Sequence, residues 1–394
     1  MRICLIIPPS PFLLDERVFV QLGILKIASA LEQENYTVDM IDLSGVENYT
    51  DVLTDYAKRK DRADIFGVTA TTPQVPYAVK ISQHLKTLLP GKQSKVILGG
   101  PHVTLMHTAA KREAKKNLVG SDRATKDIEA LKSFFDVLVC GDGEIAIFDA
   151  IHEDMKIIDA DIAKSKYFLS HKQFTDLPPP ARHLVDMSSY KYFIEGEPAL
   201  SLIAQLGCPF HCTFCSGRNS PFLRKIRLRD IDAVVDEVEM LYLTYGVKGF
   251  MFYDDELNVN KNMVPMMNKL CDLQDKHGVD FMLRGFVKAE LFNDTQADAM
   301  YRAGFRWLLT GFESGDPTIL SNIKKIAKRE DNTRCVEIAK RHNLKVKALM
   351  SIGHAGESAE TVENTKNWLL QVEPEDFDCT IITTYPGSPY FDDA

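Results

Sequence analysis

Residues 200–216 read Leu-Ser-Leu-Ile-Ala-Gln-Leu-Gly-Cys-Pro-Phe-His-Cys-Thr-Phe-Cys-Ser, an apolar run that leads into three closely spaced cysteines. The apolar run predicts a buried strand. Cys208, Cys212 and Cys215 follow it with the spacing C-x3-C-x2-C. A loop at the carboxyl end of a strand is where parallel α/β domains hold their active sites. The segment therefore points to a fold and to a chemistry together.

The second half of the chain alternates apolar strands with amphipathic helices. The expected strands cover 200–206, 249–253, 281–285, 307–311, 346–352 and 380–384, and the expected helices cover 230–245, 261–277, 294–303, 329–342 and 360–371. Parallel strands joined by helices can curl into a barrel with its active site at the carboxyl ends of the strands. We therefore expect residues 199–394 to form a partial (β/α)6 barrel.

The first half shows the same alternation. Its expected strands cover 2–7, 37–42, 65–69, 95–99 and 137–139, the last of this half, and its expected helices cover 23–34, 51–60 and 77–89. Leu25, Ala28 and Leu31 recur at helical spacing in the first of these helices. Right-handed crossovers predict a doubly wound, Rossmann-like parallel sheet over 1–157, with its binding edge at the carboxyl ends of the strands.

Two stretches interrupt this pattern. The charged segment 111–132 is expected to be a solvated helix or loop. Residues 158–198 contain Pro178, Pro179 and Pro180, which cannot lie inside a helix or a central strand because proline fixes φ and removes a donor. We therefore predict a linker over 158–198.

Composition excludes several classes of protein. The chain has 394 residues, 45% of them hydrophobic, and a net charge of −8, which argues against general nucleic-acid binding. It has no apolar run long enough to span a membrane, and residues 1–9 resemble a buried strand more than a signal peptide. The eight cysteines do not form a disulfide framework, so we expect a reducing, cytoplasmic compartment. Five of them are expected to be core thiols: Cys4, Cys140, Cys271, Cys335 and Cys379.

The three clustered cysteines call for a chemical reason. Three thiolates on one loop can bind three irons of a cubic iron–sulfur cluster and leave the fourth iron open to a small molecule. Alternatives are a redox dithiol made by Cys212 and Cys215, a zinc site that includes His211, and a chance grouping of core cysteines. Polar neighbours such as Ser216, and the absence of a second ligand pair, favour the cluster.

This spacing, with Phe214 before the last cysteine, resembles the signature of radical S-adenosylmethionine (SAM) enzymes. The resemblance implies a [4Fe–4S] cluster on Cys208, Cys212 and Cys215, SAM bound to its open iron, and a partial barrel of six strand–helix units. It also implies SAM contacts from residues that end the strands: Phe214, Asp254, Asp255, Glu256, Arg284, Glu313, Ser314 and Gly353.

Each of these assignments has a plainer alternative. Asp254–Glu256 could cap the following helix, Gly311–Gly315 could be a glycine turn with a capping serine, and Arg284 could form a surface salt bridge. Residues 353–358 resemble the family's fifth-strand segment G-x-P-G-E-T but carry Ala355 and Ser358 instead of proline and threonine. Residues 385–389 resemble the loop after the sixth strand.

The first half resembles the cobalamin-binding domain that precedes many radical SAM proteins. The resemblance rests on glycine-rich strand ends and implies cobalamin contacts from Gly99, Gly100, His102, Gly141, Gly143 and Glu144. The D-x-H-x-x-G motif that supplies a cobalt ligand is missing from residues 8–17, so no histidine ligand is expected there. His102 is expected to be a loop histidine near the corrin. The alternative is a Rossmann-like domain that has lost its ligand.

The resemblance implies a radical SAM enzyme that methylates an unactivated carbon with the help of cobalamin. Other possibilities are a radical cyclase or oxidase without methyl transfer, and a non-catalytic cobalamin or redox sensor. A methylthiotransferase is disfavoured because the first half lacks a three-cysteine site. The expected partners are a small-molecule substrate of unknown class and a one-electron reductant such as flavodoxin or ferredoxin. Because relatives usually continue past the sixth strand, a C-terminal truncation is expected.

Overall fold

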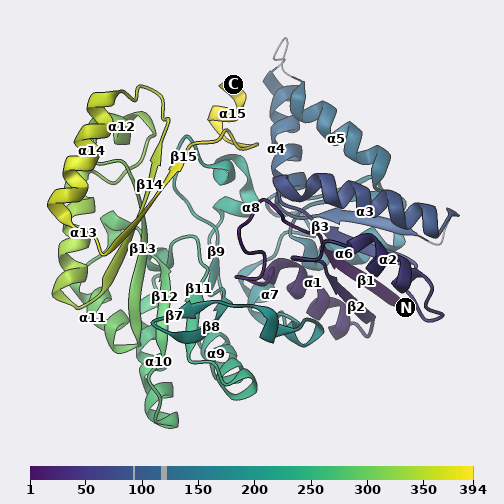
Figure 1. Cartoon of the computed structure of the whole chain (residues 1–394), viewed down its shortest axis with the longest axis horizontal. Helices are drawn as coiled ribbons and strands as arrows, with labels where there is room; N and C mark the ends of the chain where they lie inside the picture. Colours follow the sequence, from purple (N-terminus) through teal and green to yellow (C-terminus); the bar gives the residue numbers. More distant parts are fainter. Residues whose placement is uncertain (92–93, 117–121, 394) are drawn as a thin grey trace. The chain divides into compact units, whose positions relative to one another are not determined.

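The computed structural model describes residues 1–91, 94–116 and 122–393, and its chain divides into two compact units (Figure 1). Unit 1 comprises Met1–Lys191 together with Asn219–Phe222, and unit 2 comprises Tyr192–Arg218 together with Leu223–Ala394. Most of the segment expected to be a linker therefore belongs to unit 1. Among the described residues, no helix combines the length and the hydropathy needed to cross a bilayer.

Within the described part of unit 1, six parallel strands form one sheet in the order β2-β1-β3-β4-β5-β6. They are β1 (Arg2–Ile7), β2 (Thr37–Asp42), β3 (Ile65–Thr69), β4 (Lys95–Gly99), β5 (Val137–Gly141) and β6 (Ile157–Ala160). The predicted bounds of the first four strands are confirmed. The prediction that 137–139 is the last strand is wrong, because β6 follows within the segment expected to be a linker and pairs with β5.

Helices cover both faces of this sheet. They are α1 (Leu22–Gln33), α2 (Tyr49–Ala57), α3 (Val75–Leu88), α4 (Pro101–Lys116), α5 (Arg123–Phe134), α6 (Gly143–His152) and the short α7 (His171–Asp176). Helices α1 and α6 pack together over one apolar cluster, whereas α2 packs with α3, and α3 with α5. Leu25, Ala28 and Leu31 are fully buried, as the helical spacing predicted. The order of the strands reverses between β1 and β3, which is the usual position of a ligand in such folds.

The charged segment 111–132 is partly helical, because α4 extends to Lys116 and α5 begins at Arg123. Residues 117–121 of that prediction lie outside the described part of the chain. Helices α4 and α5 pack against each other. The segment is therefore part of the covering layer of unit 1.

Unit 2 contains a curled, open sheet in the order β15-β14-β13-β12-β11-β8-β7. The strands are β7 (Phe193–Ile194), β8 (Glu197–Leu202), β11 (Gly249–Phe252), β12 (Met282–Phe286), β13 (Phe305–Glu313), β14 (Lys345–Ile352) and β15 (Asp376–Ile381). All neighbours from β8 to β15 are parallel, and β7 forms an antiparallel hairpin with β8. The expected partial barrel is confirmed, and the hairpin was not predicted.

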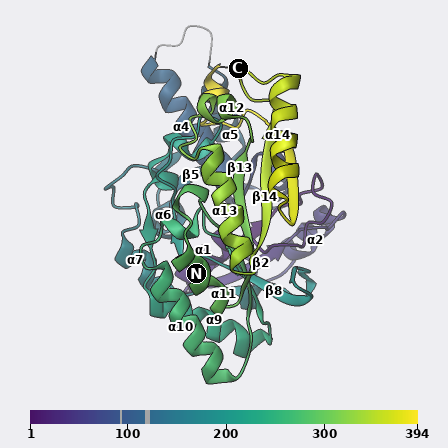
Figure 2. The same cartoon turned by 90° about the vertical axis from the view of Figure 1, so that its left-hand side faces the viewer.

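The helices of unit 2 follow the strands in turn and pack on one side of the sheet (Figure 2). They are α9 (Ile231–Tyr245), α10 (Met263–His277), α11 (Asp294–Arg302), α12 (Pro317–Asn322), α13 (Arg329–Arg341) and α14 (Ala359–Val372), with α8 (Pro221–Arg224) before them and α15 (Pro389–Asp393) after β15. Val346, Ala348 and Met350 of β14 are buried, while Lys345 and Lys347 alternate with them and are partly exposed. This alternation separates a helix-covered face from an inner face.

The first predicted strand of unit 2 is interrupted. Strand β8 ends at Leu202, and Gln205–Leu206 form a separate short strand, β9, that pairs with β10 (Arg227–Leu228). The carboxylate of Asp254 accepts hydrogen bonds from the backbone N–H groups of Ala204 and Gln205. These two bonds take the place of ladder bonds and bend the chain just before the cysteines.

Candidate functional site

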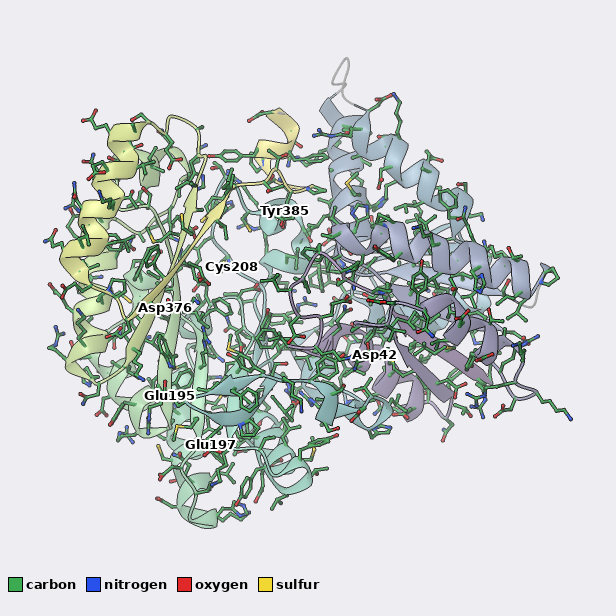
Figure 3. The ribbon with its side chains drawn as sticks, in the orientation of Figure 1. Asp42, Glu195, Glu197, Cys208, Asp376 and Tyr385 are labelled. Atoms are coloured by element: carbon green, nitrogen blue, oxygen red, sulfur yellow. The ribbon has the colours of Figure 1, made fainter. Side chains whose placement is uncertain are left out.

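The three clustered cysteines lie on a loop that begins directly after β9, where Figure 3 labels Cys208. Cys208 and Cys212 are partly buried, Cys215 is exposed, and none of the three forms a disulfide. Because β8 and β11–β15 are parallel, this loop shares one edge of the sheet with the segments that follow the other strands. We call residues 207–216 the cysteine loop.

Backbone hydrogen bonds fix the cysteine loop to unit 2 at both ends. The N–H of Cys208 donates to the carbonyl of Leu223 at 2.9 Å, and the N–H of Thr213 donates to the carbonyl of Ile323 at 2.9 Å. Gly207, at the start of the loop, has a φ of +90°, and a Cβ there would lie 2.3 Å from the carbonyl oxygen of Lys225. Only glycine fits this position.

Backbone amides also surround two of the sulfur atoms. The amide of Phe210 interacts with the sulfur of Cys208, and the amides of Gly217 and Arg218 interact with that of Cys215. Burial nevertheless raises the pKa of Cys208 to about 12. Iron binding displaces thiol protons, and hydrogen bonds to ligand sulfurs are a usual feature of iron–sulfur sites. The donor set therefore fits a cluster.

A single-ion site is not assembled here. Within residues 1–91, 94–116 and 122–393, no three His, Cys, Asp or Glu side chains are grouped closely enough to bind one metal ion. Ligands of one zinc ion lie within about 4.6 Å of each other, which is twice the Zn–S bond. The alternative of a zinc site that includes His211 therefore has no support among the described side chains.

The other five cysteines divide into two groups. Cys4, Cys140 and Cys335 are buried, and burial raises the pKa of each. The prediction of a core position is wrong for the remaining two, since Cys271 is half-buried on α10 and Cys379 is exposed. Cys379 lies on β15, an edge strand whose described residues are all exposed.

The acidic segment that follows β11 supports the cysteine loop. Asp254 is buried and accepts the two backbone bonds that bend the chain, and Asp255 accepts a hydrogen bond from the N–H of Gly207 at 2.9 Å. The carboxylate of Glu256 accepts no hydrogen bond from the described residues. Burial raises the pKa of Asp254 and that of Glu256 to about 7 each, and it also raises the pKa of Asp255. Glu256 therefore has the carboxylate that is most available to a ligand.

A buried lysine lies beside this acidic segment. Lys288 follows β12, is 3% exposed, and its Nζ lies 3.5 Å from Glu290 and 4.5 Å from the ring centre of Phe210. It opposes the rise in the pKa of Glu256. Lys288 was not predicted as a site residue, because a lysine after a strand is usually solvated.

Strand β13 ends on a strained glutamate. Glu313 has a φ of +64°, in the left-handed region, and its carboxylate accepts hydrogen bonds from Lys325 at 3.1 Å and from the hydroxyl of Ser351 at 2.9 Å. A non-glycine residue in this region is a frequent feature of functional sites. Ser314 is engaged elsewhere, since its Oγ lies 2.9 Å from Thr365 Oγ1 and accepts from the N–H of Asp316.

The segment after β14 combines an open glycine with a buried histidine. Gly353 has a φ of +95°, and the nearest atoms to a Cβ built there are those of Ile382 and Ile381 at 3.8 to 4.0 Å. His354 is buried, its Nε2 lies 2.7 Å from Ser351 Oγ, and its ring centre lies 5.4 Å from that of Phe214. Phe214 in turn packs against Ile319, Leu320 and Ile323. Ser351, His354 and Lys325 were not predicted as site residues, because only tertiary contacts bring them together.

Arg284 was expected to end its strand, but it does not. β12 continues to Phe286, and Arg284 pairs in register with Met251 and Trp307. Its guanidinium lies 5.8 Å from the ring centre of Trp307, and Nη1 lies 3.3 Å from the hydroxyl of Tyr192. Its buried Nε finds no acceptor among the described residues. Arg284 therefore lies farther along the sheet from the carboxyl edge than the other candidates.

The glycines predicted for unit 1 lie at the carboxyl ends of β4 and β5. A Cβ on Gly100 would lie 2.7 Å from Thr69 Oγ1, and one on Gly141 would lie 2.6 Å from the carbonyl carbon of Ala160. A Cβ on Gly143 would meet Ile27 Cδ1 at 2.7 Å, whereas one on Gly99 would meet nothing closer than 3.9 Å. Three of these glycines thus permit close packing inside the unit.

The two predicted polar residues of unit 1 are already partnered. The prediction that His102 lies in a loop is wrong, because it is in the first turn of α4, where the chain leads from β4 directly into the helix. It is buried, with Nδ1 3.1 Å from Thr72 Oγ1 and Nε2 3.1 Å from Asp127 Oδ2. Glu144 forms a buried ion pair with Lys26 at 3.2 Å. Both ring nitrogens of His102 are therefore occupied, which fits a cobalamin site without a cobalt ligand from this histidine.

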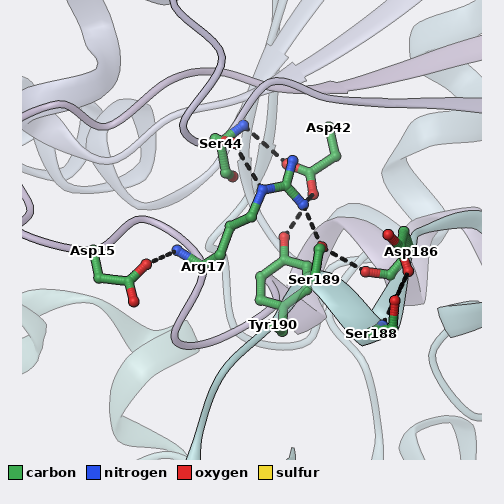
Figure 4. Close-up of polar contacts among 8 residues, drawn as sticks. All are labelled: Asp15, Arg17, Asp42, Ser44, Asp186, Ser188, Ser189 and Tyr190. Carbon is green, nitrogen blue, oxygen red and sulfur yellow. Dashed lines mark hydrogen bonds and ion pairs between the residues drawn. The ribbon is translucent and has the colours of Figure 1, made fainter.

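An unpredicted polar cluster lies at the carboxyl end of β2 (Figure 4). Arg17 lies 3.1 Å from Asp42 and donates hydrogen bonds to the carbonyl of Ser44 at 3.0 Å and to the hydroxyl of Ser189 at 2.6 Å. The hydroxyl of Tyr190 donates to Asp42 at 2.7 Å. This Arg17 cluster holds the loop after β1 against residues 186–190, within unit 1.

Comparison with known proteins gives two family matches. The radical SAM superfamily matches residues 202–369, and the B12 binding domain matches residues 16–131. An uncharacterized methyltransferase of Pyrococcus horikoshii is 26% identical over 98% of this chain and 82% of its own length. The anaerobic magnesium-protoporphyrin IX monomethyl ester cyclase of Rubrivivax gelatinosus is 25% identical over 93% of this chain, which spans only 64% of that relative.

A solved structure has the same fold. The radical SAM methyltransferase TsrM from Kitasatospora setae, solved with cobalamin and a [4Fe–4S] cluster bound, superposes with a TM-score of 0.74 at 17% identity. The match covers 99% of this chain and 73% of that one. The two family matches and the cysteine loop lead to one assignment: the chain has a radical SAM domain over residues 202–369 and, ahead of it, a B12-binding domain over residues 16–131.

Proposed function

We propose that the protein is a cobalamin-dependent radical SAM enzyme that methylates an unactivated carbon of a small molecule. The observation that carries the proposal is the cysteine loop, which presents three reduced thiols at the carboxyl edge of the half-barrel. When bound, a [4Fe–4S] cluster supplies the electron that cleaves SAM reductively, and methylcobalamin supplies the methyl group. The chain's own residues hold and orient these groups and exclude water from them.

Some residues at the edge of the half-barrel would bind the cluster or SAM directly, and others keep those residues in position. Cys208, Cys212 and Cys215 would bind the cluster. Glu256 suits the amino group of SAM, because its buried carboxylate accepts no other hydrogen bond among the described residues. Gly353 and Phe214 suit the adenosine of SAM. Gly353 leaves space beside the backbone, and Phe214 offers an aromatic ring for packing.

The remaining candidates act through their neighbours. Asp254 and Asp255 are supports for the cysteine loop, and Ser314 supports the turn after β13. Both carboxylate oxygens of Glu313 already accept hydrogen bonds, one from Lys325 and one from Ser351. Glu313 would therefore act on SAM through its negative charge and not through a direct hydrogen bond. Arg284 is positioned for an anionic group that lies deeper on the inner face of the sheet.

The proposal assigns cobalamin to the carboxyl edge of unit 1. Gly99 and Gly100 end β4, and Gly141, Gly143 and Glu144 end β5 and begin α6, so backbone groups are concentrated there. A helix N-terminus at Gly143 favours a phosphate such as that of the nucleotide tail. Because both nitrogens of His102 are occupied, cobalt would be bound without that histidine.

A second candidate is a radical cyclase without methyl transfer. It is favoured by the 25% identity to the Rubrivivax gelatinosus cyclase over 93% of this chain. The mass of the product separates the two, because methylation adds one CH2 unit. The reductant in either case would be a small electron carrier such as flavodoxin or ferredoxin, and the reduced cysteines suit a cytoplasmic location.

The test is anaerobic reconstitution with iron and sulfide, followed by dithionite, SAM and hydroxocobalamin. We expect about four irons per chain, as for one cubic cluster, together with bound corrin, 5′-deoxyadenosine and S-adenosylhomocysteine. Cys212→Ala should abolish iron uptake, whereas the control Cys271→Ala, on α10, should retain it. A Cys212→Ala protein that kept its cluster and still cleaved SAM would contradict the proposal. Bound corrin without 5′-deoxyadenosine would instead indicate a sensor.

A further inference from the structure

Lys325 is a buried lysine close to the cysteine loop. It lies three residues after the end of α12, and its side chain is 4% exposed, whereas the adjacent Lys324 is exposed. Burial of an ammonium group is unfavourable unless acceptors and opposite charges compensate for it. The surroundings of Lys325 must therefore supply that compensation.

Two acceptors hold the ammonium. Nζ donates to the carbonyl oxygen of Gly311 and to Glu313 Oε1, the latter at 3.1 Å. A lysine has three N–H donors, and the third meets no acceptor among the described residues. One donor of the buried cation is therefore without a partner in the described part of the chain.

A chain of hydrogen bonds fixes Glu313 and, through it, Lys325. The hydroxyl of Ser351 donates to Glu313 Oε2 at 2.9 Å, so its oxygen must accept from His354 Nε2 at 2.7 Å. Burial lowers the pKa of His354, which keeps the imidazole neutral with its proton on Nε2. The orientation of Lys325 is thus set by Glu313, which is partly buried, and through it by the buried side chains of Ser351 and His354.

Both ends of this series of hydrogen bonds lie near the cysteine loop. Ile323, two residues before Lys325, accepts the backbone hydrogen bond of Thr213, which follows Cys212. Phe214 lies against Ile323 and against the ring of His354. Burial lowers the pKa of Lys325, but Glu313, Cys212 and Glu256 together raise it, so the group remains an ammonium. The groups in direct contact with Nζ are the Glu313 carboxylate and the Gly311 carbonyl.

We propose that Lys325 is a positioning residue that raises the reduction potential of the cluster by placing a fixed, buried positive charge near the cysteine loop. The proposal rests on the proposed function. One electron passes from dithionite, or from a flavodoxin-type carrier, to the oxidised cluster, which gains one negative charge and no proton. A cation in a low-dielectric interior lowers the free energy of that extra charge. Net charge near a cluster is one of the factors that set its potential.

The test is an EPR-monitored redox titration of the full chain, reconstituted anaerobically and measured without SAM. Lys325→Gln should bind as much iron as the wild type, but its cluster should be at least tenfold harder to reduce, which is about 59 mV for one electron. Lys325→Arg, which keeps the charge, should stay near the wild-type potential. Lys324→Gln removes an exposed charge one residue away and should leave the potential unchanged.

Each result has a defined meaning. An iron-loaded Lys325→Gln protein with the wild-type potential overturns the inference and leaves the proposed function intact. If Lys325→Gln binds no iron, the inference is tested by the Lys325→Arg variant. A loaded Lys325→Arg protein at the wild-type potential supports the requirement for charge, and one with no cluster or with a shifted potential overturns it. Failure of the wild type to take up iron contradicts the proposed function instead.

Discussion

Asp255 Oδ2 accepts a hydrogen bond from the backbone N–H of Gly207 at 2.9 Å, which ties the end of β11 to the residue that precedes Cys208. Asp254 ties the same loop to the two residues at the bend after β8. The acidic segment therefore has a structural role that is separate from any ligand. This division of roles leads to the predictions that follow.

Gly207→Ala should weaken the cysteine loop. The residue would need a φ of +90°, and its Cβ would meet the carbonyl of Lys225 at 2.3 Å. A strained backbone of this kind costs about 1–3 kcal/mol, and the clash should reduce iron uptake as well. Urea unfolding and iron analysis would measure both effects. The control is Gly246→Ala, where φ is +66° but no atom lies within 4 Å, so iron binding should be normal. Equal iron loss in both variants would contradict the argument.

Asp254→Asn should change how stability depends on pH. Burial raises the pKa of Asp254 to about 7, whereas an unfolded carboxyl titrates near about 4. Between these values the folded protein binds more protons, so its free energy of unfolding falls as pH rises, by up to about 1.4 kcal/mol per pH unit for this group. The variant should lose that part of the slope in urea unfolding between pH 4.5 and pH 7. Asp275→Asn, at an exposed position on α10, should keep it.

His354→Gln should have a pH effect of the opposite sign. Burial lowers the pKa of His354, so the unfolded chain binds a proton that the folded protein does not. The contribution of His354 to the free energy of unfolding therefore increases as pH rises toward about 6.5, the unfolded pKa. The stability difference between wild type and variant should grow from pH 5 to pH 7. His183→Gln, at an exposed position in unit 1, is the control. A difference that is constant with pH would contradict a neutral, buried imidazole.

His102 should not act as a cobalt ligand. Its two ring nitrogens lie 3.1 Å from Thr72 and 3.1 Å from Asp127. The EPR spectrum of protein-bound cob(II)alamin should therefore lack nitrogen splitting from this residue and should be the same in His102→Gln. The variant should lose about 1–3 kcal/mol of stability, because it leaves buried partners unsatisfied. A change in the cobalt spectrum without a change in stability would overturn this interpretation.

The Arg17 cluster should stabilise unit 1. Arg17→Ala removes the contacts of one guanidinium with Asp42, Ser44 and Ser189. Because Asp42 is largely buried and would keep only Tyr190 and the N–H of Ser44, we expect a loss of about 1–3 kcal/mol. Thermal unfolding would detect this loss of stability, and so would limited proteolysis within residues 186–190. Arg59→Ala, at an exposed ion pair with Asp61, is the control and should have little effect.

The strands of unit 1 were predictable because their apolar runs are short and bounded by polar residues, and the bounds of β1 to β4 agree with the prediction. β6 was missed because its four residues include Asp159, which weakens the apolar signal. The bend after β8 was missed because it depends on Asp254, about 50 residues later in the chain. Local pattern thus identified the longer strands of unit 1, and it missed a short strand that contains a charged residue and a bend that depends on a distant side chain.

The same distinction applies to the site. The spacing of Cys208, Cys212 and Cys215 is visible in the sequence because the three lie on one loop. Lys325, Ser351 and His354 are separated along the chain and become neighbours only through the parallel order of β13 and β14. A lysine next to another lysine gives no sign that one is buried and the other exposed.

Two of the attachments that fix the cysteine loop, those from Cys208 to Leu223 and from Thr213 to Ile323, join main chain to main chain. Neither depends on which side chain stands at these positions. Thr213, which takes part in the second attachment through its backbone N–H, can therefore be exchanged in protein engineering to alter the polarity around the sulfurs, while the path of the backbone is retained.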